Sequence, residues 1–331
     1  MKIVWIIVSG LRVDHLSIYG NRWLKTEGFD KLGKMGRVFT QAACESVHPM
    51  GTRIELLTGL DVGGFVDVRN FFQNYRWELT LPGQLKEQGY QTVLFTDNFP
   101  MLAMYEALDA FGTVYYVPGQ GADNHISGKF FKTGDLMPST FDSVISGCSK
   151  LPGEGELDNY VRNQSYYHHL GHPSVRLFKA VTDFLETVEE ENCFLVVDCF
   201  GLGPPWDGLK EYSRFRNADE LKMLAWPVAG GVSPGDREIQ GQLNFLRRAY
   251  ADSCLFIDHL ISKIPADGLN LTVMSDHGVL IGDENYLLWE KGQTFPAVAR
   301  QVLIMCGDGI ERGSRCDDIV RPRDIFAMTK S

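Results

Sequence analysis

The sequence predicts an α/β fold in which a doubly wound, mostly parallel sheet lies between helical layers. Short apolar runs rich in β-branched residues recur along the 331 residues, and helix-like segments separate them. Several of these runs are apolar at successive positions, as strands buried on both faces are. Alternating strands and helices are typical of a parallel sheet that carries helices on each side.

The apolar runs give the expected strands. They are Ile3–Val8, Val38–Ala42, Thr92–Phe95, Val114–Val117, Phe194–Val197, Leu271–Met274 and Val302–Met305. The expected helices are Phe29–Met35, Thr52–Thr58, Leu81–Glu87, Ser174–Glu190 and Gln240–Ile264. In the last of them, Leu243, Leu246 and Tyr250 begin an apolar stripe with three- and four-residue spacing, which predicts packing on the sheet. We expect Pro265 to end this helix.

Composition predicts one soluble globular domain over residues 1–331. Hydrophobic residues make up 44% and charged residues 22% of the chain, which allows a full core. Two segments interrupt the strand and helix alternation, 119–172 and 201–236. Because long insertions in an α/β domain usually build the rim of the site, we expect both to lie there.

Charge and cysteine content exclude some classes of partner and location. A net charge of −10 predicts no attraction to nucleic acid or to an anionic membrane surface. The seven cysteines are odd in number and form no Cys-x-x-Cys pair, which argues against a disulfide framework and favours the cytoplasm. The first apolar run is too short for a signal sequence, and no later run approaches the ~18 residues of a membrane span.

Several segments carry a family resemblance. After the first expected strand the chain reads Ser9-Gly10-Leu11-Arg12-Val13-Asp14-His15-Leu16, and later segments include Arg53 followed by Leu56-Leu57-Thr58-Gly59, then Ser275-Asp276-His277-Gly278 and Trp289-Glu290-Lys291-Gly292. In this order they resemble motifs of the sulfatase family of the alkaline phosphatase superfamily. The resemblance extends to Asp324-Ile325-Phe326. It implies a sulfatase-like fold that lacks the smaller C-terminal subdomain.

The resemblance also implies a reaction centre, and key positions of that centre differ here. It implies a nucleophile at a helix N-terminus and a divalent cation held by carboxylates. Ser9 stands where the first carboxylate ligand is expected, and Pro49 stands at the nucleophile position four residues before Arg53. Gly203 replaces a site histidine. Hydrolysis by the family's usual mechanism is therefore doubtful from the sequence.

Two residues remain candidates for catalysis. A slip of the alignment by one to three residues brings His48, Met50 or Thr52 to the nucleophile position, although Arg53 and the Leu-Leu-Thr-Gly that follows it fix the register. Thr52 and Glu55 also match a capping box, so we favour a role for Thr52 as the helix cap over a nucleophilic one.

Other residues are candidates for binding an anion or a metal ion. The resemblance implies that Arg53, Lys291 and Asn98 contact the oxygens of an anionic group, and that Asp276 and His277 bind a metal if any is bound. Two ligands are fewer than the three protein ligands of a catalytic zinc site, so we expect at most one divalent ion (Ca, Mg, Mn or Zn), and no tight binding. The alternative for Asp276-His277 is a turn after a strand.

A histidine cluster is a further possible source of ligands. His168, His169 and His172 lie close in the sequence, but Gly171 and Pro173 argue against a helix there. We therefore favour a loop that faces solvent or substrate.

Three hypotheses of function follow. The first is a sulfatase-like protein with an anion-binding cleft for a small anionic or ester-bearing molecule, in which Ser9 and Pro49 replace the metal ligand and nucleophile. The second is an active sulfate or phosphate ester hydrolase or transferase with a rearranged metal centre, built from Asp276 and His277 with His48 or Asp14. The third is a non-catalytic partner or scaffold protein that uses the segment 201–236 as its interface.

Overall fold

The computed structural model of the chain is built on one large sheet. It describes residues 1–44, 48–62, 76–120, 144–145, 159–160, 163–164, 166–233, 235–288 and 294–330. The eight strands run in the order β13-β2-β12-β9-β1-β6-β3-β4. They are β1 Lys2–Val8, β2 Arg37–Ala42, β3 Gln91–Thr96, β4 Thr113–Tyr116, β6 Cys193–Cys199, β9 Asn270–Ser275, β12 Leu303–Cys306 and β13 Ser314–Val320.

Most neighbours in this sheet are parallel. The central strand β1 pairs in parallel with β6 and with β9, and β3 pairs in parallel with β6 and with β4. Strand β12 is antiparallel to β9 and β2, and β13 is parallel to β2. The predicted fold class is confirmed, and all the expected strands belong to this sheet. The outermost strand β13 was not expected, because Arg315, Asp317 and Asp318 interrupt any apolar run there.

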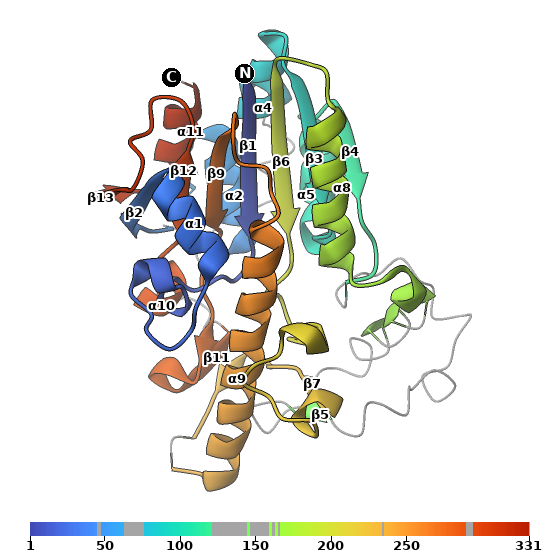
Figure 1. Cartoon of the computed structure of the whole chain (residues 1–331), viewed down its shortest axis with the longest axis vertical. Helices are drawn as coiled ribbons and strands as arrows, with labels where there is room; N and C mark the ends of the chain where they lie inside the picture. Colours follow the sequence, from blue (N-terminus) through green and yellow to red (C-terminus); the bar gives the residue numbers. More distant parts are fainter. Residues whose placement is uncertain are drawn as a thin grey trace.

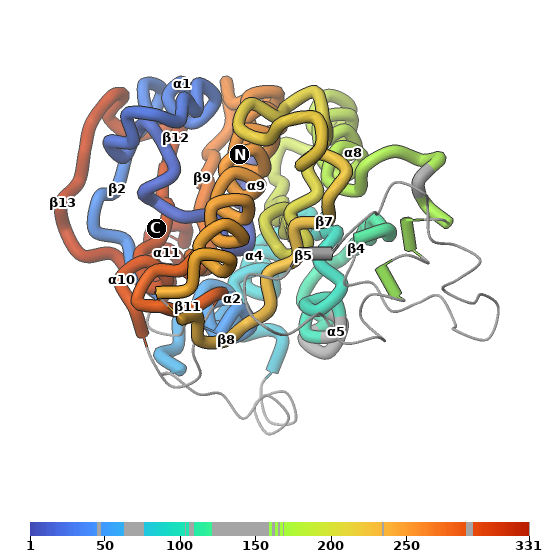
Figure 2. The backbone as a smooth tube through the Cα atoms, turned by 90° about the horizontal axis from the view of Figure 1, so that it is seen from below, coloured from blue at the N-terminus to red at the C-terminus, as the bar shows by residue number. Residues whose placement is uncertain are grey.

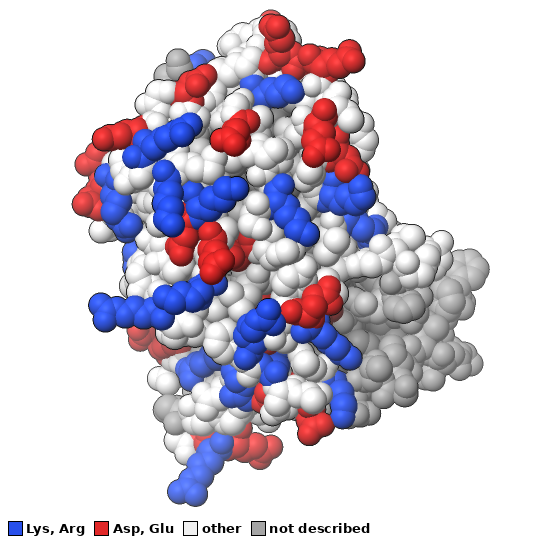
Figure 3. Space-filling view, in the orientation of Figure 1, with Lys and Arg blue, Asp and Glu red and all other residues white. Residues whose placement is uncertain are grey.

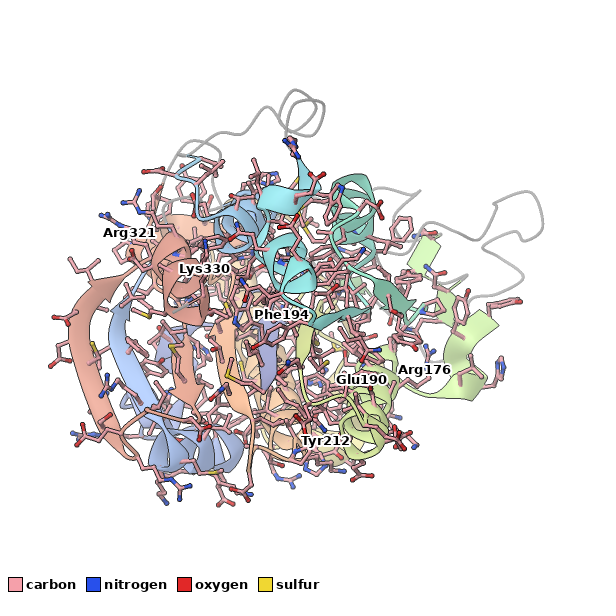
Figure 4. The ribbon with its side chains drawn as sticks, turned by 90° about the horizontal axis from the view of Figure 1, so that it is seen from above. Arg176, Glu190, Phe194, Tyr212, Arg321 and Lys330 are labelled. Atoms are coloured by element: carbon pink, nitrogen blue, oxygen red, sulfur yellow. The ribbon has the colours of Figure 1, made fainter. Side chains whose placement is uncertain are left out.

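Helices cover both faces of the sheet (Figures 1 and 2). One face carries α1 Glu27–Met35, α8 Pro173–Thr187 and α9 Arg237–Ile261, and the other carries α2 Pro49–Thr58, α4 Leu81–Glu87, α5 Phe99–Leu108 and α11 Pro322–Lys330. The short helix α10 is Pro296–Ala299. In Figure 4, Phe194 of β6 lies inside the packed interior, and Arg321, the residue before α11, lies nearer the edge of the molecule.

The two helical layers give two cores because β1 alternates between them. Val4, Ile6 and Val8 pack in the cluster that contains residues of α1, α8 and α9. Ile3, Trp5 and Ile7 pack in the cluster that contains residues of α2, α4, α5 and α11. A strand that is buried on both faces reads as a continuous apolar run, which is why the sequence reveals it.

Helix α9 lies three residues earlier in the chain than expected, at both ends. The apolar stripe is confirmed, since Leu243, Leu246 and Tyr250 are all buried. The expected bounds Gln240–Ile264 are wrong, because Asp236 caps a helix that runs from Arg237 to Ile261. The next residues form tighter turns, in which the Ile264 N–H donates to the Ile261 carbonyl, so the α-helical pattern stops before the proline.

Smaller elements lie around the sheet. The short strands are β5 Val144–Ile145, β7 Leu224–Ala225, β8 Gly230–Gly231, β10 Leu280–Ile281 and β11 Tyr286–Leu288. The 3-10 helices are η1 Val13–His15, η2 Ser17–Tyr19, η3 Trp77–Leu79, η4 His168–Leu170, η5 Lys210–Tyr212, η6 Glu220–Lys222 and η7 Asp283–Asn285. The segment 201–236 is fixed to α9 by a buried ion pair between Arg216 and Asp252. Most of 119–172 lies outside the described residues, so its position at a rim stays a prediction.

Surface charge is mixed on the face shown in Figure 3, where Lys and Arg alternate with Asp and Glu. Within the described ranges, no helix is both long enough and apolar enough to span a bilayer. Six cysteines there are free thiols.

Candidate functional site

Polar side chains meet at the carboxyl ends of four neighbouring parallel strands. Ser9 follows β1, Asn98 follows β3, Asp198 lies near the end of β6, and Asp276 follows β9. The strand register brings them together, because Val8 is opposite Ser275 and Thr96 is opposite Asp198. Clefts at this edge of an open parallel sheet are the usual ligand sites of α/β proteins.

The guanidinium of Arg53 stands at the centre of this group. Its Nε and Nη2 donate to Asp198 Oδ2 and Oδ1, both at 2.6 Å, and its Nη1 donates to Asp276 Oδ2 at 2.7 Å. The remaining donors reach Ser9 Oγ at 2.9 Å and the carbonyl of Pro49 at 2.9 Å. A guanidinium has five N–H groups, so protein acceptors use all of them.

This cluster is buried and strongly coupled. The side chains of Arg53, Asp198 and Asp276 are each 0% exposed. Burial opposes the charged guanidinium, but Asp198 and Asp276 outweigh it and hold the pKa of Arg53 well above its usual range. Burial likewise opposes the charged form of Asp276, yet His277 and Arg53 lower the pKa of its carboxyl. Both shifts favour the charged forms of Arg53 and Asp276.

Both carboxylates have further partners. Asp276 Oδ1 accepts from the backbone N–H groups of Gly10 at 3.0 Å and His277 at 2.7 Å. Gly10 has a φ of +74°, a left-handed conformation that glycine adopts without strain. Asp198 Oδ2 accepts from the hydroxyl of Tyr105 at 2.7 Å, and its Oδ1 accepts from Asn98 Nδ2 at 3.2 Å. The carboxylates are held in place on every side that the structure describes.

The start of helix α2 differs from its expected form. The helix begins at Pro49, and the ring of His48 caps it by accepting from the Met50 N–H at 3.3 Å. The expectation that Thr52 caps the helix is wrong, because Pro49 at the first position sets the start three residues earlier. Thr52 is instead buried, and its hydroxyl donates to the carbonyl of Asp276 at 3.3 Å.

The two histidines of the site have different surroundings. His48 is exposed, and burial of part of its ring, with His277 and Arg53 nearby, lowers the pKa of its imidazole. His277 is 5% exposed, and its Nδ1 lies 2.7 Å from the carbonyl of Gly278. Its Nε2 lies 3.6 Å from Asp276 Oδ1. The Asp276-His277 turn thus combines backbone capping with the ion cluster.

The remaining predicted site residues lie elsewhere. Lys291 is outside the described residues. His172 is half-buried and its Nδ1 accepts from the Ser174 N–H at 3.2 Å as the N-cap of α8, while His169 is exposed. Asp14 pairs with Arg12 and His15 rather than with the ion cluster. The structure thus brings His48, Thr52, Arg53, Asn98, Asp276 and His277 together.

Sequence reasoning missed two buried acids. Asp198 completes the ion cluster, and Asp97 accepts from Gln120 Nε2, Ser174 Oγ and the Phe200 N–H. Burial raises the pKa of Asp97 to about 6. The available signal was an acid at the carboxyl end of an apolar run, since Asp97 follows Thr92–Phe95 and Asp198 follows Phe194–Val197, as Asp276 follows Leu271–Met274.

The donor set does not fit a divalent cation. Asp198 and Asp276 already pair with the guanidinium of Arg53. A metal ion placed between the same carboxylates would be repelled by this positive charge. At the third position Ser9 offers a neutral hydroxyl, which accepts from Arg53 and donates to Asp276 Oδ2 at 3.1 Å. No group of three or more His, Cys, Asp or Glu side chains placed to hold a metal occurs among the described residues. Catalytic zinc sites use three protein ligands, and calcium uses six to eight oxygens.

Comparisons with known proteins agree on the class of this fold. The chain is 22% identical to an arylsulfatase of Clostridium perfringens (strain 13 / Type A) over 363 residues, which cover 98% of this chain and 73% of the relative. The crystal structure of a phosphonate monoester hydrolase of Agrobacterium radiobacter superimposes with a TM-score of 0.66 at 17% identity, over 98% of this chain and 72% of that chain. A protein solved in complex with its substrate D-glucosamine-2-N,6-O-disulfate superimposes with a TM-score of 0.63 at 13% sequence identity. The match covers 98% of this chain and 75% of that chain.

The fold and the strand-edge site therefore define an α/β protein of the sulfatase and alkaline phosphatase type. The model of the Sulfatase family matches residues 2–327, so the chain belongs to the Sulfatase family. The resemblance seen in the sequence motifs is confirmed. The structural likenesses, at these low identities, establish the shared fold.

Proposed function

We propose that this chain is a sulfatase-family protein that binds a small anionic or ester-bearing molecule without hydrolysing it. The observation that carries the proposal is the position of Arg53. Its guanidinium lies between Asp198 and Asp276, within 2.7 Å of both, where the carboxylates that would hold a metal ion are already paired with a cation. A centre without a cation there has no Lewis acid to activate an ester or a nucleophile.

The nucleophile position supports the same proposal. Pro49 has no side-chain group that can attack, and its carbonyl accepts from Arg53. The hydroxyl of Thr52 lies near by in the chain but is buried and directed to the carbonyl of Asp276. An attack by Thr52 would first require this hydrogen bond and the helix around it to rearrange.

The class of ligand is proposed from relatives. One similar structure is described with a disulfated glucosamine as its substrate. Because every N–H of Arg53 is used within the protein, an anion is expected to bind without displacing it, through groups around the exposed His48. Lys291, which the resemblance assigns to anion binding, stays a candidate for the same role.

The test measures binding and turnover on one preparation. The wild-type protein would be incubated with 4-nitrophenyl sulfate, 4-nitrophenyl phosphate and a phosphonate monoester, with and without Mn²⁺, Ca²⁺ or Zn²⁺. Thermal shifts would be recorded with glucosamine 6-sulfate and with glucosamine as the control that lacks the sulfate. We expect a shift with the sulfated sugar only and no turnover above that of the Arg53→Ala variant.

An active hydrolase with a rearranged centre is the rival outcome. Turnover that exceeds the Arg53→Ala background and is lost in His48→Ala, or in Thr52→Val, would refute the proposal and identify the group that replaces Pro49. Retention of folding by these variants would be checked by circular dichroism. If turnover is lost in Asp276→Asn but kept in His48→Ala, the reaction would be assigned to the Asp276-His277 turn after β9.

We also propose that the protein is cytoplasmic and binds neither nucleic acid nor membranes. The odd number of cysteines and the net charge of −10 support this. Fractionation of cells into soluble and membrane fractions tests the location, and recovery in the membrane pellet would contradict it.

A further inference from the structure

We propose that the Arg53 guanidinium is a built-in cation that replaces a dissociable divalent ion, and that Asp198 and Asp276 regain a divalent-ion site when Arg53 is removed and Ser9 is replaced by an acid. The inference deepens the proposed function, since both rest on the same ion cluster. It concerns which cation the carboxylates hold, and its test does not depend on catalysis.

Geometry supports a replacement at one shared position. The guanidinium contacts Asp198 through two N–H groups and Asp276 through a third, so one planar cation joins the ends of β6 and β9. Its Nη2 also lies 2.9 Å from Ser9 Oγ after β1. A bidentate guanidinium is the side-chain cation that best matches carboxylate geometry. Three strand ends therefore converge on one positive charge supplied by α2.

Charge balance predicts what the vacated position would accept. Arg53 with Asp198 and Asp276 leaves one excess negative charge in a site that is 0% exposed. Replacing Arg53 by Ala and Ser9 by Asp gives three carboxylates, and a divalent ion among them restores the same single excess charge. Ser9 Oγ lies 3.1 Å from Asp276 Oδ2, so an acid at this position reaches the space that the guanidinium leaves.

The chain offers a matched control in a second buried ion pair. Arg216 Nε donates to Asp252 Oδ2 at 2.9 Å, and both side chains are at most 2% exposed. Arg216 pairs with a single carboxylate, and Asp252 lies in helix α9 rather than at the end of a strand. Its removal unpairs a buried acid to a similar degree but creates no convergent set of carboxylates, so Arg216→Ala should gain no metal.

The experiment measures metal content and thermal stability rather than activity. Wild type, Arg53→Ala/Ser9→Asp and Arg216→Ala would be refolded or dialysed with MnCl2, gel-filtered, and analysed by inductively coupled plasma mass spectrometry and calorimetry. We expect about one Mn²⁺ per chain in the double variant. At a free Mn²⁺ concentration of about one hundred times the Kd, the Tm of the double variant should rise by ~4 °C. Wild type and Arg216→Ala should bind no stoichiometric Mn²⁺ and show no shift.

Every outcome decides the proposal. A double variant that folds only with Mn²⁺ supports it, and one that stays unfolded with and without Mn²⁺ contradicts it. A folded double variant without bound metal also overturns it, as does stoichiometric Mn²⁺ in the wild type that Asp276→Asn removes. Ester hydrolysis by a metal-free wild type would refute the proposed function and leave this inference standing.

Discussion

Replacing Arg53 by Met removes the only cation that the described structure places between Asp198 and Asp276. Both carboxylates are 0% exposed and would become uncompensated buried charges. Breaking a buried ion pair by removing one partner costs about 3–5 kcal/mol. With an unfolding entropy of about 2.1 cal/mol/K per residue, this lowers the Tm of a chain of 331 residues by ~4–7 °C. Scanning calorimetry and urea denaturation measure both quantities.

A second substitution makes this prediction sharper. In the wild type, Asp276→Asn removes one partner of Arg53 and should destabilise. In the Arg53→Met background the same change should stabilise, because the amide removes an unpaired buried charge while its Oδ1 still accepts from Gly10 and His277. A change of sign between the two backgrounds is the expected result. Destabilisation by Asp276→Asn in both backgrounds, or a loss below ~1 kcal/mol for Arg53→Met, would refute the reasoning.

Three further predictions follow from the site. Tyr105→Phe removes a 2.7 Å hydrogen bond to the buried Asp198 and should lower the free energy of unfolding by about 1.5–3 kcal/mol in urea denaturation, with an unchanged slope; a loss near zero would contradict the bond. Gly10→Ala should cost about 1–2 kcal/mol, because φ is +74° and an added Cβ would lie 3.3 Å from the Leu202 carbonyl; thermal denaturation tests it, and wild-type stability would show the turn to be unstrained. Burial raises the pKa of Asp97 from 3.8 to about 6, so its contribution to stability is full below 3.8 and is lost as the pH rises through about 6. As the pH falls from about 6 to 3.8, the free energy of unfolding should therefore increase less in Asp97→Asn than in wild type. Parallel curves of the two proteins would refute the raised pKa of Asp97.

The fold could be predicted from the sequence because its sheet is buried on both faces. Each expected strand is an apolar run, and β1 shows why, since residues from Ile3 to Val8 pack alternately in two cores. Strand β13 escaped prediction because it lies at an edge with charged residues. Helix α5 escaped because its apolar residues show no clear helical face.

The site could be predicted only in part. Motif resemblance identified Arg53, Asn98 and Asp276, and the missing groups at Ser9 and Pro49. It did not identify Asp198, because this acid lies within a buried strand and 145 residues separate it from Arg53. Only the register of β6 beside β3 and β1 brings the two together. Arg53, which the resemblance assigns to anion binding, lies in the structure within an internal ion cluster with Asp198 and Asp276.

The most direct test of the central claim is a crystal structure grown in the presence of MnCl2, with anomalous data collected at the manganese edge. We predict planar guanidinium density between Asp198 and Asp276, with hydrogen-bond distances to both, and no anomalous peak at that position. An anomalous peak between the two carboxylates, with the Arg53 side chain turned away, would contradict it.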